Sequence, residues 1–336
     1  MLHKGNFFIK NMEIIEKRIN VFIITGFLGA GKTTLLNQLL KQFEGKRNVV
    51  IENEFGKVNI DTQLITNKFE MVYELTNGCI CCSLDEELYD ALTEVGQKKE
   101  EIDNLFIETT GIADVGNIAT IFKVIQIAKV FDLKKIICVV DSENIEDVMT
   151  EAIEPQRQLI ASDCILLNKT QLVSNDYVDK LEATIQSINP FARIIKNGDL
   201  NKDILFEGNS DEKVILNPEI NKENAHKINN VLYESTDLFD YGALLHVLNT
   251  TLLFYYHQIF RIKGFVKCIN YQSNDRFEKI YEVQSTGKSP MITLVEKNNF
   301  EKNQLVFIGK SLKTDSITRI LRGAVIKRGD KVLETV

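Results

Sequence analysis

One short stretch near the start of the chain has the residue types and spacing of a phosphate-binding loop. Residues 26–34 read GFLGAGKTT and fit the pattern G-x-x-x-x-G-K-[S/T]. Glycines let the backbone curl so that successive N–H groups point at phosphate oxygens, at the positive end of a helix. Lys32 would neutralise the β- and γ-phosphates, and the hydroxyl of Thr33 would ligate magnesium. The predicted phosphate-binding residues are Gly26, Gly29, Ala30, Gly31, Lys32, Thr33 and Thr34.

The sequence on both sides of this loop supports the same interpretation. Residues 21–24 are apolar and rich enough in β-branched side chains for a buried strand, and residues 33–43 place leucines at helical spacing. The alternative is a glycine turn that binds nothing, and the strand and helix on either side make it the weaker one. The sequence therefore predicts a nucleotide-binding protein.

Three cysteines lie close together in a C-x-C-C pattern. Cys79, Cys81 and Cys82 follow Gly78, on a segment that comes after an expected strand. Structural zinc usually has four ligands, often as two C-x-x-C pairs far apart in sequence. Three thiolates with a fourth ligand from elsewhere would bind a soft metal and still release it. We favour transferable metal binding. The leading alternative is a redox switch, and a fixed zinc site and buried structural sulfur are the others.

A carboxylate and a glycine follow another expected strand, in the sequence ETTG. Glu108 could hold magnesium through water or orient the attacking water, and Gly111 could sense the γ-phosphate. The alternative for Glu108 is a solvated strand end, which the phosphate-binding loop upstream makes less favoured. The predicted catalytic residues are Lys32, Glu108 and Gly111.

A further strand ends in a pattern that resembles the start of the guanine-recognising N-K-x-D motif. Asn168 and Lys169 occupy its first two positions, and Gln171 stands where the motif has Asp. That Asp normally accepts from guanine N1–H and from the exocyclic amine. A glutamine carbonyl accepts one hydrogen bond but lacks the charge and the paired acceptors. We therefore expect guanine binding through Asn168 and Lys169, with weaker specificity than usual.

Alternating strand and helix signals fill the first two hundred residues. Apolar strands are expected at residues 21–24, 48–51, 71–75, 104–108, 135–140, 163–167 and 192–195. Strands of this kind separated by helices indicate a mostly parallel sheet that is covered on both faces, with ligands bound beyond the carboxyl ends of the strands. The predicted fold is α/β, a P-loop NTPase domain, followed by a smaller C-terminal α+β domain.

The domain boundaries follow changes in composition. We predict an N-terminal extension at 1–18, the P-loop GTPase domain at 19–207, a polar linker at 208–228 and the C-terminal α+β domain at 229–336. Met12 is a candidate for the native start, because the compact chain would begin just after it. In the second domain we expect strands at 259–262 and 305–308 and helices at 241–253 and 316–322.

Composition limits the classes of function. The chain has 336 residues and a net charge of −7, which argues against broad binding to nucleic acid. No apolar run approaches the roughly 18 residues that a membrane span needs, so no membrane partner is expected. Six cysteines, half of them in one cluster, suit a reducing compartment, and we expect a cytoplasmic protein. Cys138 and Cys164 fall in apolar strands and are expected to be core residues.

In order along the chain, these motifs resemble the CobW-like P-loop GTPases. The resemblance rests on GFLGAGKTT, IENEFG at 51–56, NGCICC at 77–82, ETTGIAD at 108–114 and NKT at 168–170. It extends into the second domain through RIKG at 261–264 and VFIG at 306–309. The family includes zinc-responsive metallochaperones and metalloenzyme activators.

The resemblance implies a GTPase whose nucleotide state is coupled to a bound metal. The expected cofactors are GTP, Mg²⁺ and Zn²⁺, with cobalt, iron or nickel in some branches of the family. By position, Cys79, Cys81 and Cys82 take the metal-binding role, and Glu52 matches an acidic position that can join them. A second acidic position of the family is Lys57 here. The chain also lacks the histidine-rich loop of many members, since its histidines are scattered.

The expected function is therefore slow, metal- or client-stimulated GTP hydrolysis that drives transfer of zinc to a client metalloprotein, with the C-terminal domain as the surface that reads the client. Two alternatives remain. One is a P-loop kinase of small molecules, in which Asn168 and Lys169 would have no role. The other is a non-catalytic zinc or redox sensor that binds nucleotide. The sequence leaves the oligomeric state open.

Overall fold

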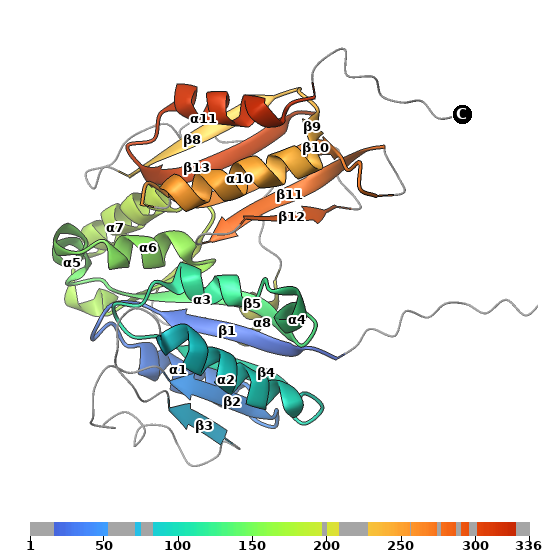
Figure 1. The fold of residues 1–336 in the computed structure, drawn as a ribbon. Coiled ribbons are helices and arrows are strands. Elements are labelled where there is room, and N and C mark those ends of the chain that lie inside the picture. The colour runs from blue at the N-terminus through green and yellow to red at the C-terminus, as the bar shows by residue number, and fades with distance from the viewer. Residues whose placement is uncertain are drawn as a thin grey trace, which may run out of the picture.

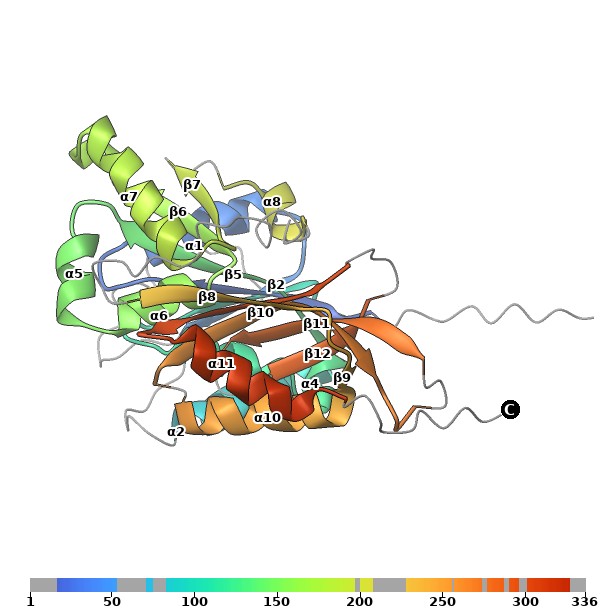
Figure 2. The same cartoon turned by 90° about the horizontal axis from the view of Figure 1, so that it is seen from above.

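The computed structural model describes residues 17–52, 71–74, 83–196, 200–207, 228–255, 257–273, 277–286, 290–295 and 301–326. Within these ranges the chain forms two sheets with helices packed on them (Figures 1 and 2). None of the helices in these ranges is long and apolar enough to cross a bilayer.

In the described part of the first domain, seven strands form a parallel sheet with the order β3-β2-β4-β1-β5-β6-β7. The strands are β1 (Ile19–Thr25), β2 (Asn48–Glu52), β3 (Met71–Glu74), β4 (Asn104–Glu108), β5 (Phe131–Asp141), β6 (Cys164–Asn168) and β7 (Arg193–Lys196). The central strand β1 pairs with β4 and β5, and its side chains are almost all buried because helices cover both faces.

Helices cover the two faces of this sheet unequally. One face packs against α1 (Lys32–Gln42) and α8 (Lys202–Phe206), through leucines of α1 and a group of aromatic rings around Phe22. The helices of the other face are α2 (Ser83–Gln97), α3 (Val115–Ile121), α4 (Ile125–Ala128), α5 (Ile145–Glu151), α6 (Glu154–Ala161) and α7 (Asn175–Ile188). Of these, α3 and α6 lie between the two sheets in Figure 1.

The second domain is built on a mostly antiparallel sheet. Its described strands run in the order β12-β11-β10-β13-β8, and a short strand β9 pairs in parallel with β10. They are β8 (Ile228–Ser235), β9 (Phe239–Asp240), β10 (Ile259–Ile269), β11 (Glu278–Thr286), β12 (Pro290–Leu294) and β13 (Asn303–Lys310). Two helices, α10 (Tyr241–Tyr255) and α11 (Thr314–Leu321), pack on one face through an apolar cluster that includes Leu244, Leu248 and Phe307.

The opposite face of this sheet packs against the first domain. One apolar cluster contains Phe260, Val306 and Ile308 from the second sheet together with Leu159 of α6 and Leu181 of α7. The two domains therefore share a core.

The predicted fold class is confirmed, both for the α/β domain and for the α+β domain. The expected strands and helices are found, with most ends shifted by a few residues; β5, for example, begins at Phe131 rather than at 135. Cys138 and Cys164 are core residues as expected, and Cys268 is buried as well. Burial raises the pKa of each of these three thiols to about 12, which keeps them protonated and unreactive.

Candidate nucleotide site

The predicted phosphate-binding loop (P-loop) joins β1 to α1, and two of its glycines, Gly26 and Gly31, lie where an added Cβ would clash with a neighbouring strand. Gly26 has φ +138, and a Cβ added there would lie 2.2 Å from the carbonyl oxygen of Val139 on β5. Gly31 has φ +103, and a Cβ there would lie 2.4 Å from Nδ2 of Asn168. The loop can pass this close to two neighbouring strands only because these positions lack side chains. Its N–H groups then precede the first turn of α1, which is the anion-binding end of a helix.

The P-loop is linked to the end of β4 by a side-chain hydrogen bond. Thr33 Oγ1 donates to Glu108 Oε1 at 2.9 Å, and both side chains are partly buried. Nζ of Lys32 donates to the carbonyl oxygen of Phe27 within the same loop at 3.3 Å. A hydroxyl and a carboxylate side by side beside a lysine form a hard-oxygen donor set that fits Mg²⁺ bound to a nucleotide phosphate. Thr33 and Glu108 would hold that ion, and Lys32 would face the phosphates.

The loop after β4 packs against the P-loop. A Cβ at Gly111 would lie 2.6 Å from the backbone nitrogen of Leu28, so only glycine permits this approach. Behind it, the hydroxyls of Thr109 and Thr25 are buried and 3.0 Å apart, and they join the ends of β4 and β1. This threonine pair was not predicted from the sequence, although a polar residue at the end of each buried strand was a visible signal.

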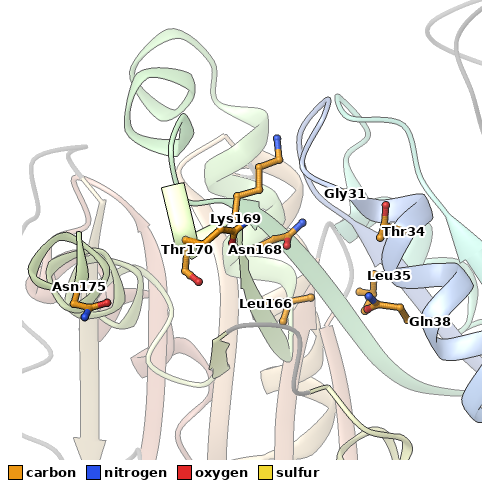
Figure 3. A pocket seen from close by; sticks show the side chains of 10 residues that line it. Gly31, Thr34, Leu35, Gln38, Leu166, Asn168, Lys169, Thr170 and Asn175 are labelled. Carbon is orange, nitrogen blue, oxygen red and sulfur yellow. The ribbon is translucent and has the colours of Figure 1, made fainter. Parts of the chain in front are cut away.

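A cavity of about 490 Å³ lies between α1 and the segment that follows β6 (Figure 3). Thr34 and Gln38 of α1 face it from one side, and Thr170 and Asn175 come from the opposite side. The lining residues are Gly31, Thr34, Leu35, Gln38, Leu166, Asn168, Lys169, Thr170, Gln171 and Asn175. Since the cavity is lined both by Gly31 of the P-loop and by Gln171, it has the position and size for the base of a nucleotide.

Asn168 and Lys169 shape this cavity through contacts within the protein. Nδ2 of Asn168 donates to the carbonyl oxygen of Ala30 at 2.8 Å, which ties β6 to the P-loop. Lys169 has a left-handed backbone with φ 58, an uncommon conformation for this residue type that is typical of functional sites. Its Nζ donates to Asp141 Oδ2 at 2.8 Å. Gln171, which stands at the Asp position of the motif, is exposed at the cavity.

Asp141 is a residue of the site that the sequence analysis did not select. Burial raises the pKa of this carboxyl, but hydrogen bonds from Lys169, Asn144 and the N–H of Glu143 outweigh it and bring the pKa below its ordinary value. Asp141 is therefore ionised and holds Lys169 in place. Its position at the end of β5, next to β6, was the signal that could have found it.

The predicted metal ligands Cys79, Cys81 and Cys82 lie outside the described residues, as does Lys57. Glu52 is described: it ends β2, in register with Glu108 of β4 on one side and with Glu74 of β3 on the other. Among the residues that the structure describes, no group of three or more His, Cys, Asp or Glu side chains is placed to hold a metal ion. The thiolate site and the part of Glu52 in it stay predictions.

Two family models match the chain, one for each domain. Residues 20–196 match the model described as CobW/HypB/UreG, nucleotide-binding domain, and residues 228–325 match the cobalamin synthesis protein cobW C-terminal domain. The chain belongs to the CobW family. The resemblance drawn from the motifs is thereby confirmed, and with it the nucleotide-binding nature of the P-loop domain.

Curated relatives and solved structures agree with this assignment. The chain is 34% identical over 259 residues to the zinc chaperone YjiA of Escherichia coli K12, which covers 73% of this chain and 81% of that protein. It is 37% identical over 186 residues to the zinc-regulated GTPase metalloprotein activator 1 of Schizosaccharomyces pombe, which covers 53% of this chain and 45% of that protein. The crystal structure of Zn(II)-bound YjiA GTPase from E. coli superposes with a TM-score of 0.64 at 24% identity, over 91% of this chain and 99% of that one, and it shares the fold.

Proposed function

We propose that this protein is a GTP-binding and GTP-hydrolysing metallochaperone, which couples its nucleotide state to binding zinc and transferring it to a client metalloprotein. The observation that carries the proposal is the register of three carboxylate-bearing strand ends. Glu108 of β4, Glu52 of β2 and Glu74 of β3 are aligned on neighbouring strands, and Cys79 follows Glu74 by five residues in sequence. The nucleotide site and the end of β3, the strand that precedes the cysteine segment in sequence, therefore share one edge of the sheet.

The chain's own residues account for the nucleotide chemistry. The loop glycines and the N-terminal turn of α1 bind phosphate oxygens, and Lys32 neutralises charge on them. Mg²⁺, when bound, supplies further neutralisation of that charge. Thr33 and Glu108 are the residues placed to hold it, and Glu108 is also placed to orient water. Asn168 and Lys169 hold the purine, and Gly111 lies where a loop can respond to the γ-phosphate.

Zinc is the cargo in this proposal, because both the bacterial and the yeast relative carry zinc in their names. Three thiolates are soft ligands that favour such an ion, and a fourth ligand from elsewhere that can be exchanged lets a client take the ion over. Glu52 ends its strand between Glu108 of the nucleotide site and Glu74, which precedes the cysteine segment in sequence. It is the residue through which a change at one site would most directly reach the other.

The second domain is the proposed client-reading surface. Its sheet shares a core with the GTPase domain, so a client bound to it would be near the machinery that responds to nucleotide. We place the protein in the cytoplasm, where thiolates stay reduced and GTP is available.

A paired measurement tests the proposal. Phosphate release from GTP and zinc binding are measured on the wild type and on the triple variant Cys79→Ser, Cys81→Ser, Cys82→Ser. We expect the wild type to hydrolyse GTP without a phosphorylated acceptor, and the triple variant to lose high-affinity zinc binding while it still binds GTP. Phosphate transfer to a small molecule would instead identify a kinase. Absence of turnover under every metal condition would identify a non-catalytic sensor.

A further inference from the structure

The helix α6 lies between the two sheets (Figure 1). It contacts the loop after β4 through a hydrogen bond from Gln158, and it packs on the second domain through Leu159. It is a short helix of Glu154–Ala161, and five of its last six residues are buried. No motif in the sequence distinguishes it.

On the nucleotide side, two adjacent residues of α6 hold the loop that follows β4. Gln158, with 0% of its surface exposed, donates from Nε2 to the carbonyl oxygens of Gly111 at 3.0 Å and Ala113 at 3.2 Å. Nη1 of Arg157 donates to Asp114 Oδ2 at 3.2 Å. The segment that lies against the P-loop is thus fixed at both Gly111 and Asp114 by one helix.

On the other side, two adjacent residues of β10 hold the same helix. Nη1 of Arg261 donates to the carbonyl oxygens of Ile160 at 2.7 Å and Ser162 at 3.0 Å, at the negative end of the helix. The ring of Phe260 lies under Arg157, whose guanidinium carbon is 5.7 Å from the ring centroid. Arg157 therefore contacts Asp114 and the second domain at once.

The C-terminal end of α6 is fixed by further buried hydrogen bonds. Nδ2 of Asn189 donates to the carbonyl oxygens of Leu159 at 2.7 Å and Ser162 at 2.9 Å. The hydroxyl of Ser162 donates to the carbonyl oxygen of Gln158 at 2.7 Å. Because buried polar groups are costly to leave unpaired, a shift of the helix relative to these partners would lose stabilising hydrogen bonds.

The loop side, by contrast, has room and a spare acceptor. Oε1 of Gln158 is buried and, among the described residues, accepts no hydrogen bond. Gln158 also lines a cavity of about 280 Å³ together with Phe27 and Leu28 of the P-loop. A loop N–H that turned toward Oε1 would give a second hydrogen-bonded arrangement of the same two segments.

We propose that Gln158 and Arg157 are positioning residues for the loop after β4, which contains Gly111, and that α6 transmits the state of this loop to β10 through Arg157 and Arg261. The GTP-bound and GDP-bound forms then differ at β10 of the second domain as well as at the P-loop. This inference rests on the proposed GTPase function, and it specifies how that function is communicated between the domains.

Hydrogen exchange on the full-length protein tests it, with either a non-hydrolysable GTP analogue and Mg²⁺ or GDP and Mg²⁺ bound. In the wild type we expect amide exchange in α6 and at the start of β10 to differ between the two nucleotides by about fivefold or more, the lower end of ordinary coupling between sites. Gln158→Met keeps the side-chain length but removes both donated hydrogen bonds, and should abolish the difference in β10.

The chain offers a matched control on the same helix. Gln156 is also buried, and its Nε2 donates to the carbonyl oxygen of Met149 at 2.9 Å, away from the loop. Gln156→Met should keep the nucleotide-dependent difference. If Gln158→Met does not fold, Arg157→Met provides the same test at a more exposed position, and Arg157→Lys should restore part of the difference through Asp114.

The inference is overturned if wild-type β10 exchanges equally with the two nucleotides, or if Gln158→Met keeps the difference, or if Gln156→Met loses it equally. The readout contains no zinc, so it separates this inference from the proposed function. A protein whose zinc affinity ignores the nucleotide would contradict the proposed function, while its β10 could still respond.

Discussion

The edge of the parallel sheet and the interface between the domains both gather charged side chains, but they use them differently. At the sheet edge, Lys32, Glu108 and Lys169 are partly exposed around the P-loop and the cavity beside it. At the interface, Arg261 is 3% exposed and Lys263 1% exposed, and Arg261 Nη2 lies 3.1 Å from Asp163 Oδ1. A partly exposed charge can exchange water for a ligand, whereas a buried charge depends on its protein partners to replace the lost hydration.

The pKa of Asp163 shows the effect of these buried partners. Burial raises the pKa of its carboxyl, but the positive charges of Arg261 and Lys263 outweigh burial and hold the pKa below the ordinary value. Similar charged side chains thus serve the proposed ligand binding in one region and domain docking in the other. Burial decides which.

The largest expected effect is a loss of stability when the buried ion pair of Arg261 and Asp163 is broken. Arg261→Met leaves Asp163 and two helix-end carbonyls without this donor, and should lower the free energy of unfolding by about 3–5 kcal/mol in urea titrations. Arg193→Met is the matched control, because Arg193 also pairs with a carboxylate, Glu207, but both are about half exposed. It should cost less than about 1 kcal/mol. Equal effects of the two variants would contradict the distinction between the regions.

At the sheet edge we expect a large loss of activity with little change in stability. Lys32→Ala should reduce kcat/KM for GTP hydrolysis by about 100-fold or more, as loss of a charge-stabilising donor does in other enzymes. Its free energy of unfolding should change by less than about 1 kcal/mol, because the side chain is partly exposed. The readouts are phosphate release and urea unfolding of the same preparation. A variant that unfolds easily but keeps its hydrolysis would show that Lys32 has a structural role.

A third prediction concerns pH. Burial, together with the positive charge of Arg261, lowers the pKa of Lys123 from 10.5 to about 8. Between pH 8 and 10.5 the unfolded chain holds a proton that the folded chain has released, so raising the pH through this window stabilises the fold. The gain should be about 2 kcal/mol after allowance for partial exposure.

Urea unfolding of the wild type and of Lys123→Met at several pH values isolates this contribution. The variant should be the more stable protein near pH 7, and the difference should shrink as the pH rises to 10.5. A difference that is constant across this range would show that Lys123 ionises like an exposed lysine.

The smallest expected effect is a change in nucleotide preference when a residue of the cavity beside α1 is replaced. Gln171→Asp adds a charged acceptor for two guanine N–H groups, and should raise the preference for GTP over ATP by about tenfold in binding titrations. Asn175→Asp, at a cavity position outside the N-K-x-D pattern, is the matched control and should leave the preference within about threefold. An unchanged preference in Gln171→Asp would mean that the base does not reach this residue.

The sequence predicted the regions where function depends on local pattern. The loop Gly26–Thr34 follows a buried strand, and Glu108 and Asn168 each end one, so their presence at a common edge of the sheet could be predicted. Partners far apart in sequence could not. Asp141 holds Lys169 across 28 positions, Gln158 holds Gly111 across 47, and Arg261 reaches Asp163 across 98. Such contacts depend on how strands and domains are ordered, and no residue pattern specifies that order.

The interface illustrates the same limit. In the sequence, Arg261 belongs to an RIKG motif of the second domain and carries no sign of a partner. Only the packing of β10 on α6 brings it to the helix carbonyls. A buried arginine is uncommon enough that its burial is informative once the structure is known, but exposure is the default expectation for this residue type.

The central claim is that the nucleotide state and metal binding are coupled, and reciprocal calorimetry tests it most directly. Zinc is titrated into the protein with a non-hydrolysable GTP analogue and with GDP, and each nucleotide is titrated with and without zinc. We predict that zinc affinity differs between the two nucleotide states by about fivefold or more, and that zinc changes the ratio of the two nucleotide affinities by the same factor. Equal zinc affinity in both states, with equal nucleotide affinities in both zinc conditions, would contradict the account.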